Sequence, residues 1–197
     1  MNRSLRIIVA DDEPDVLKHF QECLEALGHQ VLAAVRTGAQ LVEQCRELHP
    51  DLVVTDIKMP DLDGIEAAQR IRQDSPVPVI LVSAYHDPEL IERALADHVL
   101  AYLVKPIRKD DLEPAIALAM RRFQEFQALQ QQADDLRQAL EDRKIVERAK
   151  GILMKRANCD EQTAFTRLQK LSSEKNRKMV DIARMVVTAE EAFNTLD

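Results

Sequence analysis

Three aspartates, a serine and a lysine stand where short apolar runs of this 197-residue chain end. In chain order they are Asp11, Asp12, Asp56, Ser83 and Lys105. Carboxylates that converge on one place repel each other unless a cation lies among them, and a set of oxygen ligands suits Mg²⁺. A lysine and a hydroxyl beside them are suitable partners for an anion. These residue types therefore predict a Mg²⁺ site at which an anion forms, provided that the fold brings them together.

Alternating strands and helices must position these residues. The apolar runs are too short for helices and mostly β-branched, so each predicts a strand, at residues 5–10, 30–34, 52–55, 79–83 and 101–104. Between them, apolar residues recur every three or four positions, at 16–27, 41–48 and 90–95. This order predicts an α/β fold, a (βα)5 doubly wound parallel sheet covered on both faces. Its ligand site lies beyond the carboxyl ends of the strands, where the five residues stand.

The same residues resemble the receiver domain of two-component response regulators. The resemblance covers about residues 4–122 and rests on Asp11-Asp12, the stretch DIKMPDLDG from Asp56 to Gly64, Ser83-Ala84, Tyr102 and Lys105-Pro106. It implies that a sensor histidine kinase transfers a phosphoryl group to Asp56. It also implies that Asp12, Asp56 and the backbone carbonyl of Lys58 bind Mg²⁺ directly, while Asp11 acts through water.

Phosphoryl transfer agrees with the roles that the resemblance implies. Mg²⁺ neutralises charge between the attacking carboxylate and the phosphoryl oxygens, and Lys105 supplies a second positive charge. The product adds negative charge and acceptor oxygens, to which Ser83 would donate a hydrogen bond while Tyr102 turns inward. The alternative to this switch role is that Tyr102 is a half-buried residue that only contributes packing. The resemblance also predicts a cis peptide bond before Pro106.

A long helix is predicted from about Asp110 to Arg156. Phe126, Leu129, Ala133, Leu136 and Leu140 step by three and four residues, as the a and d positions of a coiled coil do. This stripe predicts a homodimer through the helix, and the alternative is an intramolecular spacer. The predicted division is a receiver domain at 1–122, a helical coiled-coil linker at 123–140 and a third module at 141–197.

The third module is basic and helical. Residues 1–142 hold 15 Lys and Arg against 26 Asp and Glu, whereas residues 143–184 hold 12 against 5. A local basic field attracts polyanions that the whole chain, with a net charge of −7, would not. Apolar spacing predicts a small all-α three-helix bundle, with Asp160 capping the second helix, Phe165 in the core and a polar connector at 172–177.

The stretch ERAKGILM from Glu147 to Met154 resembles the signature of the ANTAR domain of RNA-binding antitermination regulators. Further matches, within about residues 136–192, are Ala164-Phe165, Leu171-Ser172, Asn176-Arg177-Lys178 and Asp181-Ile182-Ala183. The resemblance implies that the module, as a dimer, binds paired RNA hairpins in nascent transcripts and stabilises them against a terminator.

Among the residues that carry this resemblance, we assign RNA contacts by the charge and the hydrogen-bonding capacity of each side chain. Lys150, Arg177 and Lys178 are predicted to bind phosphates, and Ser172 and Asn176 to bind base edges. Where the family often has Leu-Arg, this chain reads Leu168-Gln169-Lys170, so a phosphate or base contact is either lost or moved to Lys170. Gly151 costs a helix about 1 kcal/mol relative to alanine, which predicts close approach by RNA or by another helix.

Two other functions remain open. One is a DNA-binding response regulator, against which the predicted connector 172–177 is longer than the turn of a helix-turn-helix motif. The other is a protein-interaction adaptor with a receiver input. The chain has no apolar run of about 20 residues, so no membrane partner and a cytoplasmic location are predicted. Outside the receiver site no set of nucleophile, base and oxyanion donors is present, which predicts a regulator that is not an enzyme.

Overall fold

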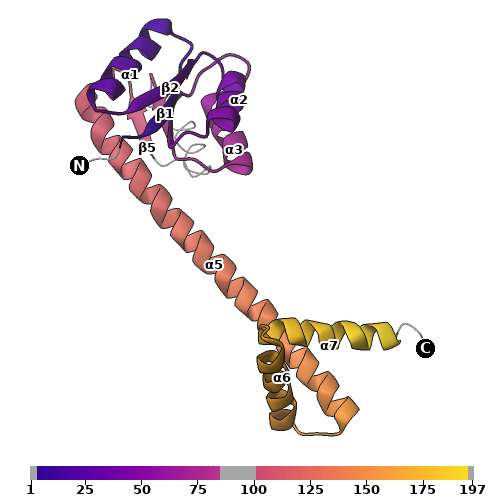
Figure 1. Ribbon diagram of the computed structural model, residues 1–197. Helices are drawn as coiled ribbons and strands as arrows, with labels where there is room; N and C mark the ends of the chain where they lie inside the picture. Colours follow the sequence, from indigo (N-terminus) through magenta and orange to yellow (C-terminus); the bar gives the residue numbers. More distant parts are fainter. Residues whose placement is uncertain (1–3, 85–100, 195–197) are drawn as a thin grey trace. The chain divides into compact units, whose positions relative to one another are not determined.

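A five-stranded parallel sheet with the order β2-β1-β3-β4-β5 forms the N-terminal part of the computed structural model, which describes residues 4–84 and 101–194 (Figure 1). The strands are β1 (Arg6–Ala10), β2 (Gln30–Val35), β3 (Leu52–Asp56), β4 (Val79–Ser83) and β5 (Ala101–Val104). Each lies within one residue of a predicted run. The sequence-based prediction of a doubly wound α/β fold is therefore confirmed.

Within the described residues, α1 (Pro14–Ala26), α2 (Gly38–Leu48), α3 (Gly64–Asp74) and the start of α5 pack against this sheet. Side-chain capping explains where α2 and α3 begin: the Thr37 side chain accepts a hydrogen bond from the amide of Gln40, and Asp63 does the same for Glu66. Apolar spacing predicted α1 and α2 but did not single out α3. The predicted helix at 90–95 lies outside the described residues.

Two hydrophobic clusters cover opposite faces of the sheet. Ile8 and Ala10 of β1 belong to the cluster on the α2 and α3 side, whereas Ile7 and Val9 belong to the cluster that includes α1 and the start of α5. Figure 1 shows these helices on the two sides of the sheet. Both faces of the central strands β1, β3 and β4 are therefore buried, which explains their unbroken apolar runs.

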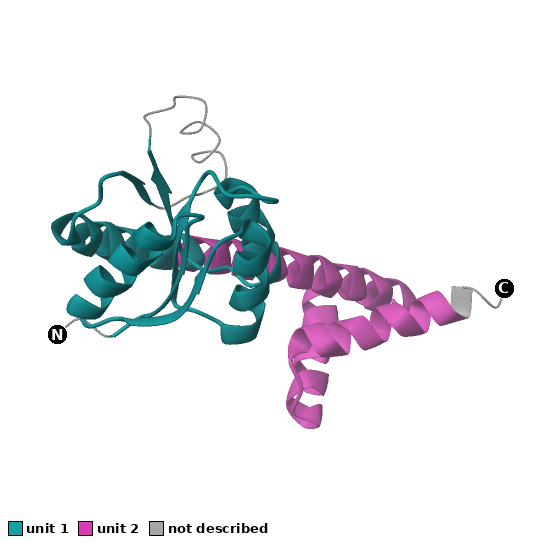
Figure 2. Ribbon diagram, turned by 90° about the horizontal axis from the view of Figure 1, so that it is seen from above, with its two compact units in different colours: residues 1–127 teal, residues 128–197 magenta. Residues whose placement is uncertain are grey.

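Helix α5 (Lys109–Ala157) is a single helix of 49 residues. The chain divides into two compact units at residue 127, inside this helix, so that α5 contributes to both (Figure 2). No break in the helix separates a linker from the third module, and the predicted boundaries at 122 and 140 stay predictions. Within the described residues, no helix is long and apolar enough to span a membrane.

The second unit joins the end of α5 to α6 (Glu161–Lys175) and α7 (Met179–Asn194). Its most buried cluster is small and consists of Ala149, Leu168, Ile182 and Ala183. As predicted, the Asp160 side chain caps α6, where it accepts a hydrogen bond of 2.8 Å from the amide of Thr163.

Two details of this unit correct the sequence-based prediction. The polar stretch predicted as a connector is mostly helical, because α6 continues through Lys175 and the turn contains only residues 176–178. Polar side chains in the last turn of a solvated helix resemble a loop in a sequence, which explains the error. Phe165, predicted to lie in the core, is only half-buried and is not part of the buried cluster.

Candidate functional site

The strand ends bring a lysine and two aspartates together. Ala10 pairs with Thr55 in the sheet, so Asp11 and Asp56 follow at the same level. The Lys105 Nζ atom lies 2.7 Å from Asp11 Oδ2 and 2.9 Å from Asp56 Oδ1. The side chains of Asp11 and Asp56 are 0% and 7% exposed, and that of Lys105 is 18% exposed. One ammonium therefore serves two buried carboxylates, at the edge of the sheet where the sequence predicted a site.

The backbone after β3 holds the Asp56 carboxylate in place. The amide of Lys58 donates a hydrogen bond of 2.7 Å to Asp56 Oδ2. The amide of Gly64 closes the loop with a bond of 2.8 Å to the carbonyl of Ile57. A Cβ atom on Gly64 would lie 2.0 Å from the Asp56 carbonyl oxygen, so only glycine fits at this position.

Burial and charge act in opposite directions on the acidic site. Burial raises the pKa of Asp56, and the hydrogen bond and charge of Lys105 reduce this rise without cancelling it. For Lys105, burial disfavours the charged form, but the hydrogen bonds to Asp11 and Asp56 outweigh it and raise the pKa. Two carboxylates with one ammonium leave net negative charge in a buried place, which favours the binding of a further cation.

The donor set fits Mg²⁺. Carboxylate oxygens of Asp11, Asp12 and Glu13 all lie within 4.8 Å of one another. Asp11 Oδ2 is a buried carboxylate oxygen that contacts the Lys105 ammonium at 2.7 Å. Hard oxygen ligands of this kind suit Mg²⁺. Asp11 and Asp12 were predicted as Mg²⁺ ligands from the sequence. Glu13 was not predicted, although it follows them directly in the sequence.

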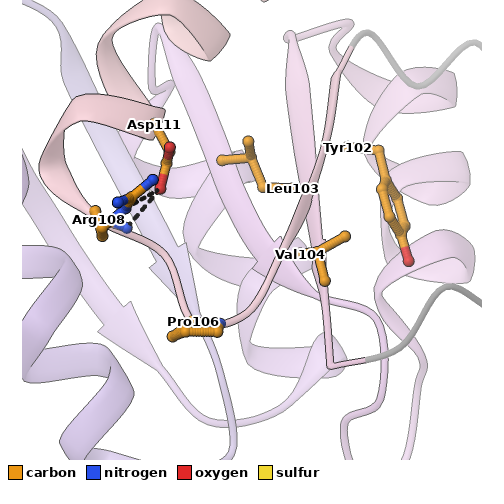
Figure 3. Close-up of a pocket in the computed structure, with 6 residues that line it drawn as sticks. All are labelled: Tyr102, Leu103, Val104, Pro106, Arg108 and Asp111. Atoms are coloured by element: carbon orange, nitrogen blue, oxygen red, sulfur yellow. Dashed lines mark hydrogen bonds and ion pairs between the residues drawn. The ribbon is translucent and has the colours of Figure 1, made fainter.

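Ser83 and Tyr102 stand on the strands beside the acidic site. Ser83 is 4% exposed at the end of β4, and its carbonyl accepts a hydrogen bond of 2.8 Å from the amide of Lys105. Tyr102 on β5 is half-buried and packs against the cluster on the α2 and α3 side. Figure 3 shows its ring on the opposite side of the strand from Leu103 and away from the Arg108–Asp111 ion pair. The Lys105–Pro106 peptide bond is cis, as the resemblance implied.

Lys150, predicted to bind phosphates, is engaged inside the helical bundle. Its Nζ atom lies 2.9 Å from a carboxylate oxygen of Glu147 and 2.7 Å from one of Glu161, and its side chain is only 9% exposed. The hydrogen bonds to these two residues raise the pKa of Lys150, so it stays charged. Its ammonium therefore ties α5 to the first turn of α6.

The turn between α6 and α7 exposes the other predicted cations. Arg177 and Lys178 are exposed, and so is the neighbouring Lys175. No ion pair within residues 128–194 engages any of these three side chains, which distinguishes them from Lys150. Asn176, between them, has a left-handed backbone with φ of 49° and ends α6. Lys175 was not among the predicted RNA contacts, although it lies in the same basic stretch.

In the second unit, Gly151 is half-buried and Lys170 is exposed. A Cβ atom built on Gly151 meets no atom within 4 Å, so packing within the chain does not require glycine there. Lys170 is exposed, and its Nζ atom lies 3.9 Å from Glu174 on the same helix. An exposed pair at this distance contributes little and leaves the lysine accessible.

Two protein-family models match this chain and define the class of protein to which it belongs. The family model described as "Response regulator receiver domain" matches residues 7–117, and the one described as "ANTAR domain" matches residues 134–187. The fold and the acidic sheet edge are thus those of a receiver domain. The chain belongs to the response regulators that carry a receiver domain followed by an ANTAR domain, and so to the proteins of two-component systems.

Individual relatives agree with this assignment. "Transcriptional regulatory protein PdtaR" of Mycobacterium tuberculosis is 38% identical over 183 residues, which cover 92% of this chain and 89% of the relative. The chemotaxis protein CheY of Bacillus subtilis is 35% identical over 112 residues, 56% of this chain and 93% of CheY. A receiver domain crystal structure from Clostridium thermocellum, 31% identical, matches 61% of this chain and 98% of its own with a TM-score of 0.57. These likenesses point to a regulatory protein.

Proposed function

We propose that phosphorylation of Asp56 by a sensor histidine kinase controls this response regulator, which acts as a transcription antiterminator by binding RNA hairpins in nascent transcripts. The observation that carries the proposal is the Lys105 ammonium shared by the buried carboxylates of Asp11 and Asp56. The ANTAR domain on the same chain and the transcriptional relative support the RNA part.

Asp56 is the proposed nucleophile. One of its carboxylate oxygens forms a bond to phosphorus while the bond from phosphorus to the kinase imidazole breaks and its electron pair stays on nitrogen. Asp11, Asp12, Asp56 and the Lys58 carbonyl would hold Mg²⁺, which when bound neutralises charge between the carboxylate and the phosphoryl oxygens. The Lys105 ammonium, already 2.9 Å from Asp56 Oδ1, contacts the oxygens of the product.

The phosphoryl group changes the residues on the neighbouring strands. It brings additional negative charge and strong acceptor oxygens to a place that is almost closed to solvent. In the proposal, the Ser83 hydroxyl moves to donate to one of these oxygens, and Tyr102 turns inward from its half-buried position on β5. The receiver then differs in shape between its two states.

The α6–α7 turn is the proposed RNA surface. Arg177, Lys178 and Lys175 bind phosphates, because they are exposed and form no ion pair within residues 128–194. Asn176 offers its amide to a base edge, and Lys170 binds a further phosphate. The proposed phosphate-binding residues do not include Lys150, because its ammonium is held between Glu147 and Glu161.

Dimerisation is the proposed link between phosphorylation and RNA binding. Leu129, Leu136 and Leu140 on α5 are 65%, 67% and 59% exposed, which is unusual for large apolar side chains that repeat on one helix face. A second copy of α5 would cover them. Phosphorylation that favours this dimer places one RNA module beside another and raises the effective concentration of the second.

A binding measurement tests the proposal. The full-length protein is titrated with an RNA that carries two short hairpins, with a scrambled RNA and with duplex DNA, at two salt concentrations, with and without Mg²⁺ and a phosphoryl donor. We expect selective, salt-sensitive binding to the hairpin RNA that the donor strengthens. Asp56→Asn should abolish the effect of the donor, whereas the exposed control Asp61→Asn should retain it. Equal, weak binding to all three nucleic acids would contradict the proposal.

The length of the α6–α7 turn is also compatible with a second function, which is DNA binding. A turn of three residues is compatible with a helix-turn-helix motif, which removes the objection that the predicted longer connector raised against DNA. Preference for duplex DNA over the hairpin RNA in direct competition would support this second function. A protein-interaction adaptor would show no salt-sensitive binding to any nucleic acid.

A further inference from the structure

Two hydrogen bonds that run in opposite directions close the α6–α7 turn. The amide of Arg177 donates to the carbonyl of Ser172 over 3.1 Å, and the Ser172 hydroxyl donates back to the carbonyl of Arg177 over 2.5 Å. The turn between them includes the left-handed residue Asn176. Both backbone polar groups of Arg177 are therefore held by one residue of α6.

The Ser172 hydroxyl is already used within the chain. A hydroxyl has a single hydrogen to donate, and here that hydrogen goes to the Arg177 carbonyl. Ser172 is also half-buried, whereas Lys175, Arg177 and Lys178 are exposed. A direct donor bond from Ser172 to a base would require the turn to open first.

The neighbouring serine has a different role, which makes it a natural comparison. The Ser173 hydroxyl donates to the carbonyl of Gln169 over 3.1 Å, one turn earlier in the same helix. It therefore adds a bond inside α6 and does not reach across the turn. Two adjacent serines differ in whether they hold the segment that carries the exposed cations.

We propose that Ser172 is a positioning residue, whose hydroxyl holds the α6–α7 turn in the conformation that presents Arg177 and Lys178 to RNA phosphates. The inference rests on the proposed RNA-binding function and specifies how its surface is organised. A turn held before RNA arrives loses less conformational freedom on binding, and this gain in affinity comes from preorganisation without a contact to RNA.

The experiment compares four variants of the full-length protein in binding the two-hairpin RNA. Ser172→Ala removes the bond, Ser172→Thr keeps the hydroxyl, Ser173→Ala is the matched control, and the double change Arg177→Gln and Lys178→Gln removes the presented cations. Loss of one hydrogen bond predicts about a three- to tenfold higher Kd for Ser172→Ala. Ser172→Thr and Ser173→Ala should bind as the unchanged protein does.

Two further readouts distinguish positioning from general damage and from failure of the proposed function. The thermal midpoint of Ser172→Ala should match that of Ser173→Ala, which carries the same loss of one hydroxyl. An unchanged Kd for Ser172→Ala, with a raised Kd for the double variant, would overturn the positioning role and leave RNA binding in place. An unchanged Kd for the double variant would instead overturn the proposed RNA surface, and the positioning role with it.

Discussion

The receiver site and the α6–α7 turn organise charge in opposite ways. In the receiver, two nearly inaccessible carboxylates at the ends of the buried strands β1 and β3 contact one ammonium, which follows the half-buried strand β5. In the second unit, the cations lie on the surface of a turn that one serine closes, over a buried cluster of only four residues. The positions of the charged groups in the buried site thus follow from the order of the strands. In the surface site, which cations are accessible depends on which of them form ion pairs with nearby carboxylates.

The largest expected effect comes from truncating a buried leucine on each side of this comparison. Leu24→Ala in the receiver and Leu168→Ala in the bundle each remove a side chain that is 0% exposed and should each cost about 2–5 kcal/mol. The bundle has the smaller core and less stability to lose. Hydrogen exchange should therefore show lost protection throughout α6 and α7 for Leu168→Ala and a receiver that stays folded for Leu24→Ala. Retained protection in the bundle would show that its stability does not depend on this cluster.

Removing the shared ammonium should give the next largest effect. Lys105→Met leaves Asp11 and Asp56 buried without their cation, which should lower the free energy of unfolding of the receiver by about 3 kcal/mol. Mg²⁺ should restore much of this loss, because it supplies positive charge at the same place. Urea unfolding with and without Mg²⁺ measures both values. Lys18→Met, in an exposed pair with Glu22, is the control and should change little. A Lys105→Met protein that Mg²⁺ fails to stabilise would argue against the metal site.

Two basic residues of the second unit should show opposite phenotypes. Lys150→Met removes the tie to Glu147 and Glu161, so it should lower the thermal midpoint and leave the RNA affinity of the folded protein unchanged. Arg177→Gln should leave the midpoint unchanged, weaken RNA binding severalfold and reduce the salt slope by about one. Calorimetry and RNA titration at several salt concentrations check the pair. The opposite assignment of phenotypes would mean that Lys150 is the phosphate contact.

The smallest expected effect is a pH dependence confined to the receiver. Burial lowers the pKa of His29 below its ordinary value of 6.5, and Glu113 opposes this shift. Since the unfolded chain then binds more protons, the stabilising contribution is complete above pH 6.5 and is lost as the pH falls below it. His29→Asn keeps an acceptor for the Leu5 amide, which donates to Nδ1 in the structure, and should flatten this slope. Unfolding by urea between pH 5 and 7.5 measures it, and equal slopes in the two proteins would contradict it.

The sequence was sufficient for the receiver because topology leaves few choices. Once five buried runs are taken as parallel strands, their carboxyl ends must share an edge, and Asp11, Asp56 and Lys105 must meet there. The spacing of apolar residues did not predict helix α3, although Asp63 before Gly64 is a capping signal from which its start could have been predicted.

The second unit was less predictable because its features depend on local pairing. Lys150 and Lys178 look alike in a sequence, and only the distance from Lys150 to Glu161, eleven residues away, distinguishes the engaged lysine from the exposed one. The serines at 172 and 173 are typical of a loop, yet they lie within the last turns of α6, which continues to Lys175 and leaves a turn of three residues instead of the six predicted. Neither difference has a signature in residue type or spacing.

Gly151 makes the chain a candidate for a selection experiment. Because a methyl group at this position meets nothing, alanine should fit and stabilise α5 by about 1 kcal/mol. A library selected only for thermal stability should therefore replace this glycine quickly, whereas one selected for antitermination should keep it. At Gly64, where a methyl group would collide with the Asp56 backbone, both selections should retain glycine. The two positions would then separate a glycine retained for folding from a glycine retained for what the chain binds.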